Sequence, residues 1–197
     1  MNPRRDAAFT KIELLVCLFI AGVLFLLILP SPGGHGLTRG QMTQTLSNMK
    51  QLSLASQQMA LDGDTTGNTN LGLPGDIGGT FTNWARQLVP AYLSTNDFCK
   101  LLSAAGKVVP PGKIPQSMSN CAVLVYAVST NSPETAVFLT SANFTNTPQG
   151  GGPLNKSAKP YGDKGFVVFR RGGDGAILLP KQVTATNFIG SYAPLLK

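Results

Sequence analysis

The acidic side chain of Glu13 stands at the edge of the most apolar stretch of the sequence, AAFTKIELLVCLFIAGVLFLLILP, which covers residues 7–30. Within residues 14–29 every side chain is apolar except for the thiol of Cys17. A carboxylate in an apolar medium is costly unless a cation pairs with it. The chemistry predicted for Glu13 is therefore ion pairing with a partner that neutralises its charge.

Residues that could carry catalysis are scarce elsewhere. The sequence has one histidine, His35, and its only glutamates are Glu13 and Glu134. No spacing typical of a serine nucleophile, a zinc protease or a phosphate-binding loop occurs. We expect that the protein is not an enzyme, and that His35, in the Pro- and Gly-rich segment 30–36, is solvated.

Two acidic residues suggest a cation site. Asp62 and Asp64 are two positions apart, and Gly67 falls where a calcium-binding loop turns. However, Thr66 replaces an oxygen ligand, and Leu73 stands where such a loop has its bidentate glutamate. We expect a polar loop here, with no metal and no other cofactor.

The formal net charge of +7 and the pI of about 9.5 favour acidic partners or an anionic surface. Basic residues gather towards the C-terminus, with Lys164, Arg170 and Arg171 as the candidate patch, opposed by Asp163 and Asp174. Nucleic-acid binding would require this patch to contact phosphates. Since no aromatic stacking platform is evident beside it and scattered basic residues usually solvate a surface, a solvated surface is the favoured interpretation.

Two cysteines, Cys99 and Cys121, lie in the later part of the chain. An even pair outside the cytoplasm suggests one disulfide, and two buried thiols are the alternative. A bridge would join a predicted helix to a predicted strand and stabilise the fold by roughly 3 kcal/mol in the loop-entropy description. Cys17, in the apolar run, behaves as a small hydrophobic residue.

The apolar run could serve three purposes. As a helix from Phe9, its ~21 residues would span on the order of 31 Å, comparable with a bilayer core of roughly 30 Å. Arg4 and Arg5 precede it, which predicts a cytoplasmic N-terminus. Two of these interpretations are a secretory signal peptide and a plain membrane anchor, but neither explains Glu13. The third comes from a resemblance of residues 9–15 to a known family.

The segment FTKIELL, residues 9–15, resembles the start of a type IV pilin or type II secretion pseudopilin. The resemblance implies cleavage by a prepilin peptidase between Ala8 and Phe9, followed by N-methylation of Phe9. It also implies that Glu13 pairs with the terminal amine of a neighbouring subunit during assembly. The family prefers glycine where this chain has Ala8.

The resemblance extends beyond the cleavage site. Gly22 and Pro30 occupy positions where many type IV pilins weaken the helix, and both residue types disfavour helices. The phrase NMKQLSLASQQMALDGD, residues 48–64, is also similar to pilin-like proteins of verrucomicrobia and planctomycetes.

The rest of the chain predicts a globular head. An apolar stripe at helical spacing runs from Met42 to Met59, and Gly63 is a plausible helix stop. Two short helices are expected within residues 81–93 and 94–107. Four β-rich runs follow within residues 121–180 and predict an antiparallel meander with one face on the helix and the other in water.

The expected fold class is α+β and pilin-like: a long N-terminal helix, with a membrane-embedded half, a Pro/Gly break and an amphipathic half, packed on a small antiparallel sheet. The domains expected are a leader (1–8), a transmembrane and assembly helix (9–30), a hinge with the spine helix (31–61), and the head (62–197).

The function expected from the resemblance is a structural subunit of a type IV pilus-like filament or a pseudopilus. Its partners would be copies of itself or sister subunits, a prepilin peptidase, an inner-membrane assembly platform and membrane lipid. The protein would cross the inner membrane once, with a periplasmic head that becomes extracellular on assembly into a pilus. The alternatives are a secretion pseudopilin and an anchored outer-face binding protein that does not assemble.

Overall fold

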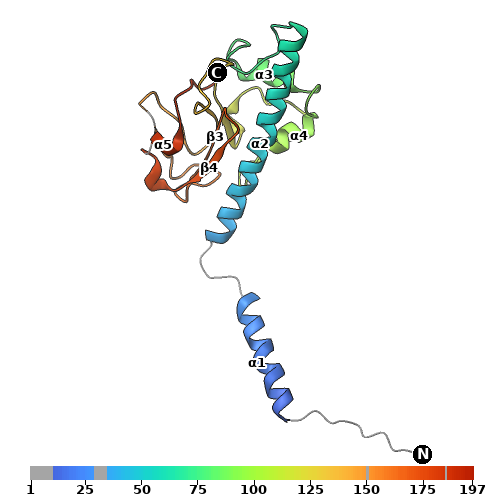
Figure 1. Ribbon diagram of the computed structural model, residues 1–197, viewed down its shortest axis with the longest axis vertical. Coiled ribbons are helices and arrows are strands. Elements are labelled where there is room, and N and C mark those ends of the chain that lie inside the picture. The colour runs from blue at the N-terminus through green and yellow to red at the C-terminus, as the bar shows by residue number, and fades with distance from the viewer. Residues whose placement is uncertain (1–10, 29–34, 150, 185) are drawn as a thin grey trace, which may run out of the picture. The chain divides into compact units, whose positions relative to one another are not determined.

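The computed structural model describes residues 11–28, 35–149, 151–184 and 186–197, and for segments 24–28, 35–37 and 186 it describes the backbone alone. The chain forms two compact units, Met1–Gly36 and Leu37–Lys197. Figure 1 shows the element order, which is helical at first and then mixed, with four strands between α4 and α5.

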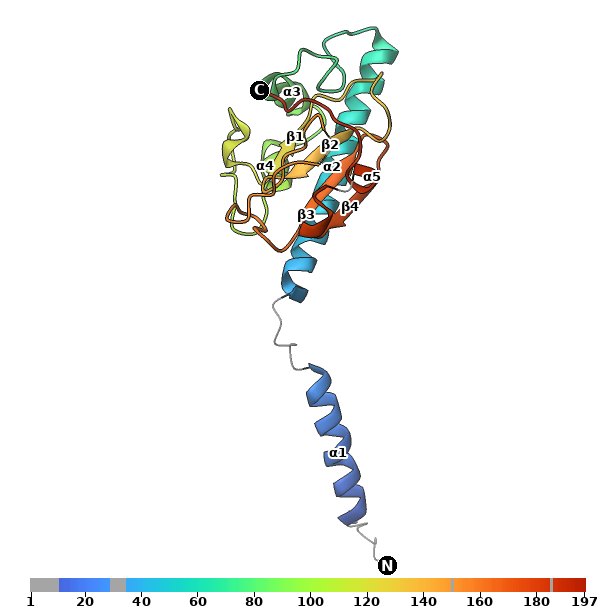
Figure 2. The same cartoon turned by 90° about the vertical axis from the view of Figure 1, so that its left-hand side faces the viewer.

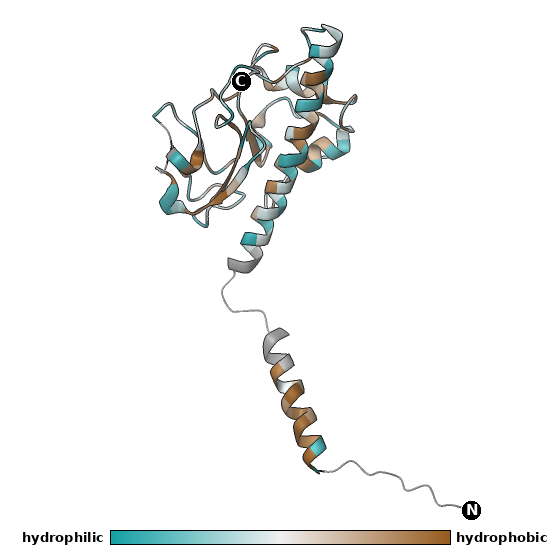
Figure 3. Cartoon of the chain, viewed as in Figure 1, coloured by the Kyte–Doolittle hydropathy of each residue, from teal (hydrophilic) through white to brown (hydrophobic). Residues whose placement is uncertain are grey.

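Helix α1, Lys11–Ile28, is hydrophobic along most of its described side chains (Figure 3). Among the described residues, no helix is both long enough and apolar enough to cross a membrane.

The expectation of one long N-terminal helix with a membrane-embedded half is therefore wrong. The structure has two separate helices, α1 and then α2, His35–Thr66, and the described part of the chain contains no long apolar helix. The sequence offers a physical reason against one continuous helix. Pro30 has no backbone N–H to donate, and a proline disfavours the helical conformation of the residue before it.

Helix α2 supplies one side of the core. The predicted apolar stripe is confirmed, because its members lie at the head's interior: Met42, Met49, Leu52, Ala55 and Met59 are buried and Leu46 is partly buried. The helix does not stop at Gly63. It continues to Thr66, and Gly67 follows with a positive φ of 68°.

The glycine at position 63 has a packing role. A Cβ there would lie 2.3 Å from the carbonyl oxygen of Leu71, because the chain after α2 folds back against the helix. The backbone N–H of Asn68 donates to the Gly63 carbonyl at 3.0 Å. A residue that resembles a helix stop thus permits a close approach of two backbone segments.

Two short helices close one end of the core. They are α3, Phe81–Leu88, capped by the Thr80 side chain, and α4, Thr95–Leu101, capped by the Ser94 side chain. The buried ring of Trp84 lies 5.9 Å from that of Phe98 and 6.4 Å from that of Phe138, between centroids. This aromatic cluster joins both helices to the sheet.

The sheet has four antiparallel strands in the order β1-β2-β3-β4, which are Val123–Val125, Val137–Ser141, Phe166–Arg170 and Gly175–Leu178. The predicted meander is thus present. Figures 1 and 2 place α2 along one face of it. All of β2 and most of β3 are buried at consecutive positions, so both sheet faces are covered and the expectation of a water-facing side is wrong.

The second covering comes from irregular segments. The N–H of Asn146 donates to the Tyr126 hydroxyl at 2.9 Å, and the Thr140 hydroxyl donates to the Phe144 carbonyl at 3.0 Å. The ring of Phe144 stacks on Phe166 with 4.2 Å between centroids. Residues 143–147 therefore pack on the strands through a buried polar network and an aromatic pair.

The C-terminal segment, residues 190–197, covers the outer edge of β1. The N–H of Leu196 donates to the Val125 carbonyl at 3.0 Å, and the N–H of Ala127 donates to the Pro194 carbonyl at 2.7 Å. Further along, the N–H of Phe81 donates to the Lys197 carbonyl at 2.9 Å. The segment thus links the edge of the sheet to the start of α3.

Candidate functional site

The residues predicted for processing and assembly lie in or near α1. Glu13 is in the first turn of this helix, while Ala8, Phe9 and Pro30 fall outside the described residues. Gly22 lies within the helix, and a Cβ there would meet nothing within 4 Å. Packing within the chain therefore does not require glycine at position 22, and the assembly role of these residues stays a prediction.

Cys99 and Cys121 are both buried, and in the structure both are free thiols. The Cys99 thiol donates to the Lys113 carbonyl at 3.4 Å, and the Cys121 thiol donates to the Ser117 carbonyl at 3.8 Å. Burial is the main reason why the pKa of Cys121 is raised to about 11, while the charge of Lys107 lowers it and Cys99 contributes a small increase; burial also raises the pKa of Cys99. Both thiols are therefore protonated near neutral pH, and the predicted disulfide stays a prediction.

The basic residues proposed as a patch have different environments. Lys164 is exposed, whereas the guanidinium of Arg171 donates to the carbonyls of Ser132 at 2.8 Å and Thr130 at 2.7 Å. Arg170 is likewise engaged, as described below. Two of the three cations thus hold backbone segments together, and the structure does not gather the three into one exposed surface.

The two aspartates considered for calcium lie on the last turns of α2. Asp62 accepts a hydrogen bond from the Tyr92 hydroxyl at 2.9 Å, which raises the pKa of this tyrosine in addition to the effect of burial. Among the described residues, no group of three or more histidine, cysteine, aspartate or glutamate side chains is placed to hold a metal ion.

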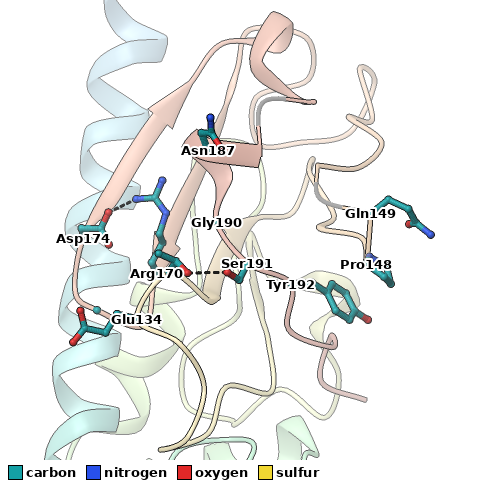
Figure 4. Close-up of a pocket in the computed structure, with 11 residues that line it drawn as sticks. Glu134, Pro148, Gln149, Arg170, Asp174, Asn187, Gly190, Ser191 and Tyr192 are labelled. Atoms are coloured by element: carbon teal, nitrogen blue, oxygen red, sulfur yellow. Dashed lines mark hydrogen bonds and ion pairs between the residues drawn. The ribbon is translucent and has the colours of Figure 1, made fainter.

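A feature that sequence reasoning missed is a depression of about 820 Å³ in the unit Leu37–Lys197 (Figure 4). Four chain segments form it: the residues before β2, the turn between β3 and β4, residues 148–149, and α5 (Thr186–Ile189) with the residues after it. We call it the Arg170 depression. Its volume falls within the range of roughly 300–1,000 Å³ typical of small-molecule sites.

Arg170 holds one wall of this depression. Its Nε donates to the Ile189 carbonyl at 3.0 Å, and its two terminal nitrogens donate to the Phe188 carbonyl and to the Asp174 carboxylate. The Arg170 side chain is 12% exposed and that of Asp174 is 62% exposed. The hydrogen bonds of Arg170 to the two carbonyls therefore anchor α5 to the β3–β4 hairpin, and its ion pair leaves Asp174 at the mouth (Figure 4).

Close backbone contacts fix the opposite side. The N–H of Ser191 donates to the Thr135 carbonyl at 2.8 Å, and the hydroxyls of these two residues hydrogen-bond at 2.7 Å. Gly190, at a φ of 115°, is required here, because a Cβ would lie 2.2 Å from the Thr135 carbonyl oxygen. The shape of the depression is thus set by main-chain geometry.

Several polar side chains at the rim have no internal role. Within the described part of the chain, the side chains of Glu134, Gln149 and Asn187 make no hydrogen bond, and Tyr192 is 42% exposed. Figure 4 shows Tyr192 and Gln149 on one side of the depression and Arg170, Asp174 and Asn187 on the other. These groups are available to a ligand.

No local sequence signal marks the depression, because its rim comes from segments far apart in the chain. Arg170 was noted as a positive charge, but its pairing depends on the hairpin turn and on the path of α5. The single available hint is the sequence GGDG, residues 172–175, which predicts the turn that carries Asp174.

No protein-family model, no curated protein and no solved structure matches the chain.

Proposed function

We propose that the protein is a pilin-like structural subunit of a filament or pseudopilus. The observation that carries the proposal is the segment FTKIELL at the head of the apolar run, with Glu13 five residues after the expected cleavage site. The packing of α2 along a four-stranded antiparallel sheet supports the proposal. In a filament, α2 would carry the head, and this helix follows the apolar segment in the sequence.

The proposed mechanism uses charge pairing between subunits. Cleavage between Ala8 and Phe9 would create a new terminal ammonium group. The Glu13 carboxylate of one subunit would pair with this ammonium of a neighbouring subunit, and the pairing would lower the cost of holding both charges in an apolar environment. Apolar contacts between the N-terminal segments would supply most of the driving force.

The partners follow from this mechanism. A prepilin peptidase would cut the precursor, an assembly platform would gather the subunits at the inner membrane, and copies of the chain or sister subunits would form the filament. The head would lie on the outer face of that membrane. No catalytic role is proposed for any residue.

The first experiment measures the intact mass of the protein isolated from membranes of cells that contain a prepilin peptidase. The expected product lacks residues 1–8 and carries one additional methyl group. A product that retains its first residues, at every level of peptidase, would overturn the proposal, because no terminal ammonium would then exist at Phe9.

The second experiment compares Glu13→Gln with the wild type in a filament-shearing assay. The variant keeps the size of the side chain and removes its charge, so we expect normal cleavage and a loss of filament incorporation. Lys11→Gln is the matched control, because it removes a charge two positions away and should leave incorporation intact. Wild-type incorporation of Glu13→Gln would contradict the pairing mechanism.

A further inference from the structure

The Arg170 depression has the dimensions and the lining of a ligand site, and it lies wholly in the unit Leu37–Lys197. We propose that it binds a neutral saccharide, with the Tyr192 ring as a stacking surface. This inference does not rest on the proposed assembly function, because it concerns one chain and a site remote in sequence from residues 1–30.

The charge of the depression disfavours a polyanion. Glu134 and Asp174 contribute two negative charges and Arg170 one positive charge, so the formal sum is −1, in a protein whose formal net charge is +7. Three of the five N–H groups of Arg170 donate to Asp174 and to two carbonyls, and its charge is paired with the Asp174 carboxylate. Among the described lining residues, no unpaired cation therefore remains to hold a phosphate or a sulfate.

A cationic ligand is also disfavoured. The Asp174 carboxylate is already paired with Arg170, which leaves Glu134 as the one unpaired carboxylate among the described lining residues. A single exposed carboxylate attracts a cation only weakly in water. The lining thus favours a ligand without net charge.

The hydrogen-bonding groups fit a polyhydroxylated ligand. The amides of Gln149 and Asn187 each offer donors and an acceptor, and the free oxygens of Glu134 and Asp174 add acceptors. Planar groups with paired donors or acceptors can bind adjacent hydroxyls of a sugar ring. The rim supplies such groups from both sides (Figure 4).

The aromatic residue completes the set. Tyr192 is 42% exposed, which leaves part of its ring without packing partners in the head. Aromatic rings bind apolar C–H surfaces, and a sugar ring presents such a surface on one face. Wall contacts that involve Ser191 and Gly190 fix the backbone next to Tyr192, so little ordering of the chain is needed on binding.

The test uses the full chain, purified in a detergent without a sugar headgroup, so that the detergent does not compete. Isothermal titration calorimetry is performed with maltotetraose, cellotetraose and chitotetraose. Spermine serves as the cationic probe and a heparin tetrasaccharide as the anionic probe. We expect saturable binding of at least one neutral tetrasaccharide, with a Kd on the order of 1 mM or tighter, and weaker binding of both charged probes.

Variants assign the binding to the depression. Tyr192→Ala should weaken saccharide binding about tenfold or more, whereas Tyr192→Phe should retain it, because the ring provides the contact. Asn187→Ala should weaken it several-fold. Asn83→Ala is the matched control, since Asn83 is an exposed asparagine on α3, and it should bind as the wild type does.

Three results would overturn the inference. The first is the absence of binding for all three neutral tetrasaccharides. The second is binding that Tyr192→Ala and Asn187→Ala leave unchanged. The third is binding of spermine or the heparin fragment that is tighter than that of every neutral probe. Trp84 fluorescence confirms that each variant is folded, because this residue is fully buried in the core.

Discussion

Two leucines on α2, two positions apart, allow a direct test of how this helix packs. Leu52 is completely buried in the head, whereas Leu54 is 55% exposed. Leu→Ala removes the same atoms at both positions, and alanine is at least as favourable as leucine in a helix. Any difference between the two variants therefore reports burial and not helix propensity.

The expected magnitudes differ several-fold. Removing a fully buried leucine costs about 2–5 kcal/mol, through lost transfer free energy and the cavity that remains. We expect about 3 kcal/mol for Leu52→Ala, which for a domain of this size corresponds to a fall in Tm of roughly 6–12 °C. Leu54→Ala should change the free energy of unfolding by about 0.5 kcal/mol or less.

Urea unfolding, followed by fluorescence, measures the effect. Trp84 is the only tryptophan of the chain and is fully buried, so its emission reports the integrity of the core. The slope of the free energy against urea should stay unchanged, because the surface exposed on unfolding hardly differs. Equal losses at Leu52 and Leu54, or a larger loss at Leu54, would refute the packing of α2 described above.

Three further predictions concern the core. Burial raises the pKa of Cys121 to about 11 and also raises that of Tyr161, so the unfolded state loses these protons first as pH rises. The contribution of these two groups to stability should therefore be fully present below about pH 9 and be lost as the pH rises from about 9 to 11, and Cys121→Ala should reduce this loss in a series of thermal melts. Gly175→Ala should lower the free energy of unfolding by about 1–3 kcal/mol in urea unfolding, because its Cβ would lie 2.4 Å from Leu46 Cδ1. Leu46→Ala in the same chain should recover part of this loss, and the absence of any recovery would contradict the clash. Asn143→Ala should cost about 1–3 kcal/mol, since its buried amide donates to two carbonyls at 3.1 and 2.8 Å, and thermal melts that match the wild type would contradict this role.

Local patterns were sufficient for the elements of the head. The stripe from Met42 to Met59 predicts the buried side of α2 because every third or fourth side chain shares one face. The GGDG turn predicts the β3–β4 hairpin because Gly173, at a φ of 91°, supplies the required conformation. Both are short-range properties, and a single sequence contains them in full.

Long-range packing was not available from such patterns. The covering of the second sheet face depends on residues 143–147, and that of the outer edge of β1 depends on the C-terminal segment. Both segments contain few periodic apolar residues. Gly63 resembles a helix stop, and only the returning chain at Leu71 shows that its small size permits a close contact. The Arg170 depression follows the same logic, since its lining comes from four segments, and Arg170 and Ser191 hold parts of it through hydrogen bonds to residues distant in the chain.

The hydrogen bonds between residues 194–196 and β1 have a consequence for handling the protein. An uncovered edge strand offers free N–H and C=O groups to other chains. Removal of residues 194–197 would leave the Val125 carbonyl and the Ala127 N–H without these hydrogen-bond partners. Protein that has lost these residues should accumulate as intermolecular β-aggregates during storage. Preparations for the experiments above therefore need an intact-mass measurement to show that residues 194–197 are present.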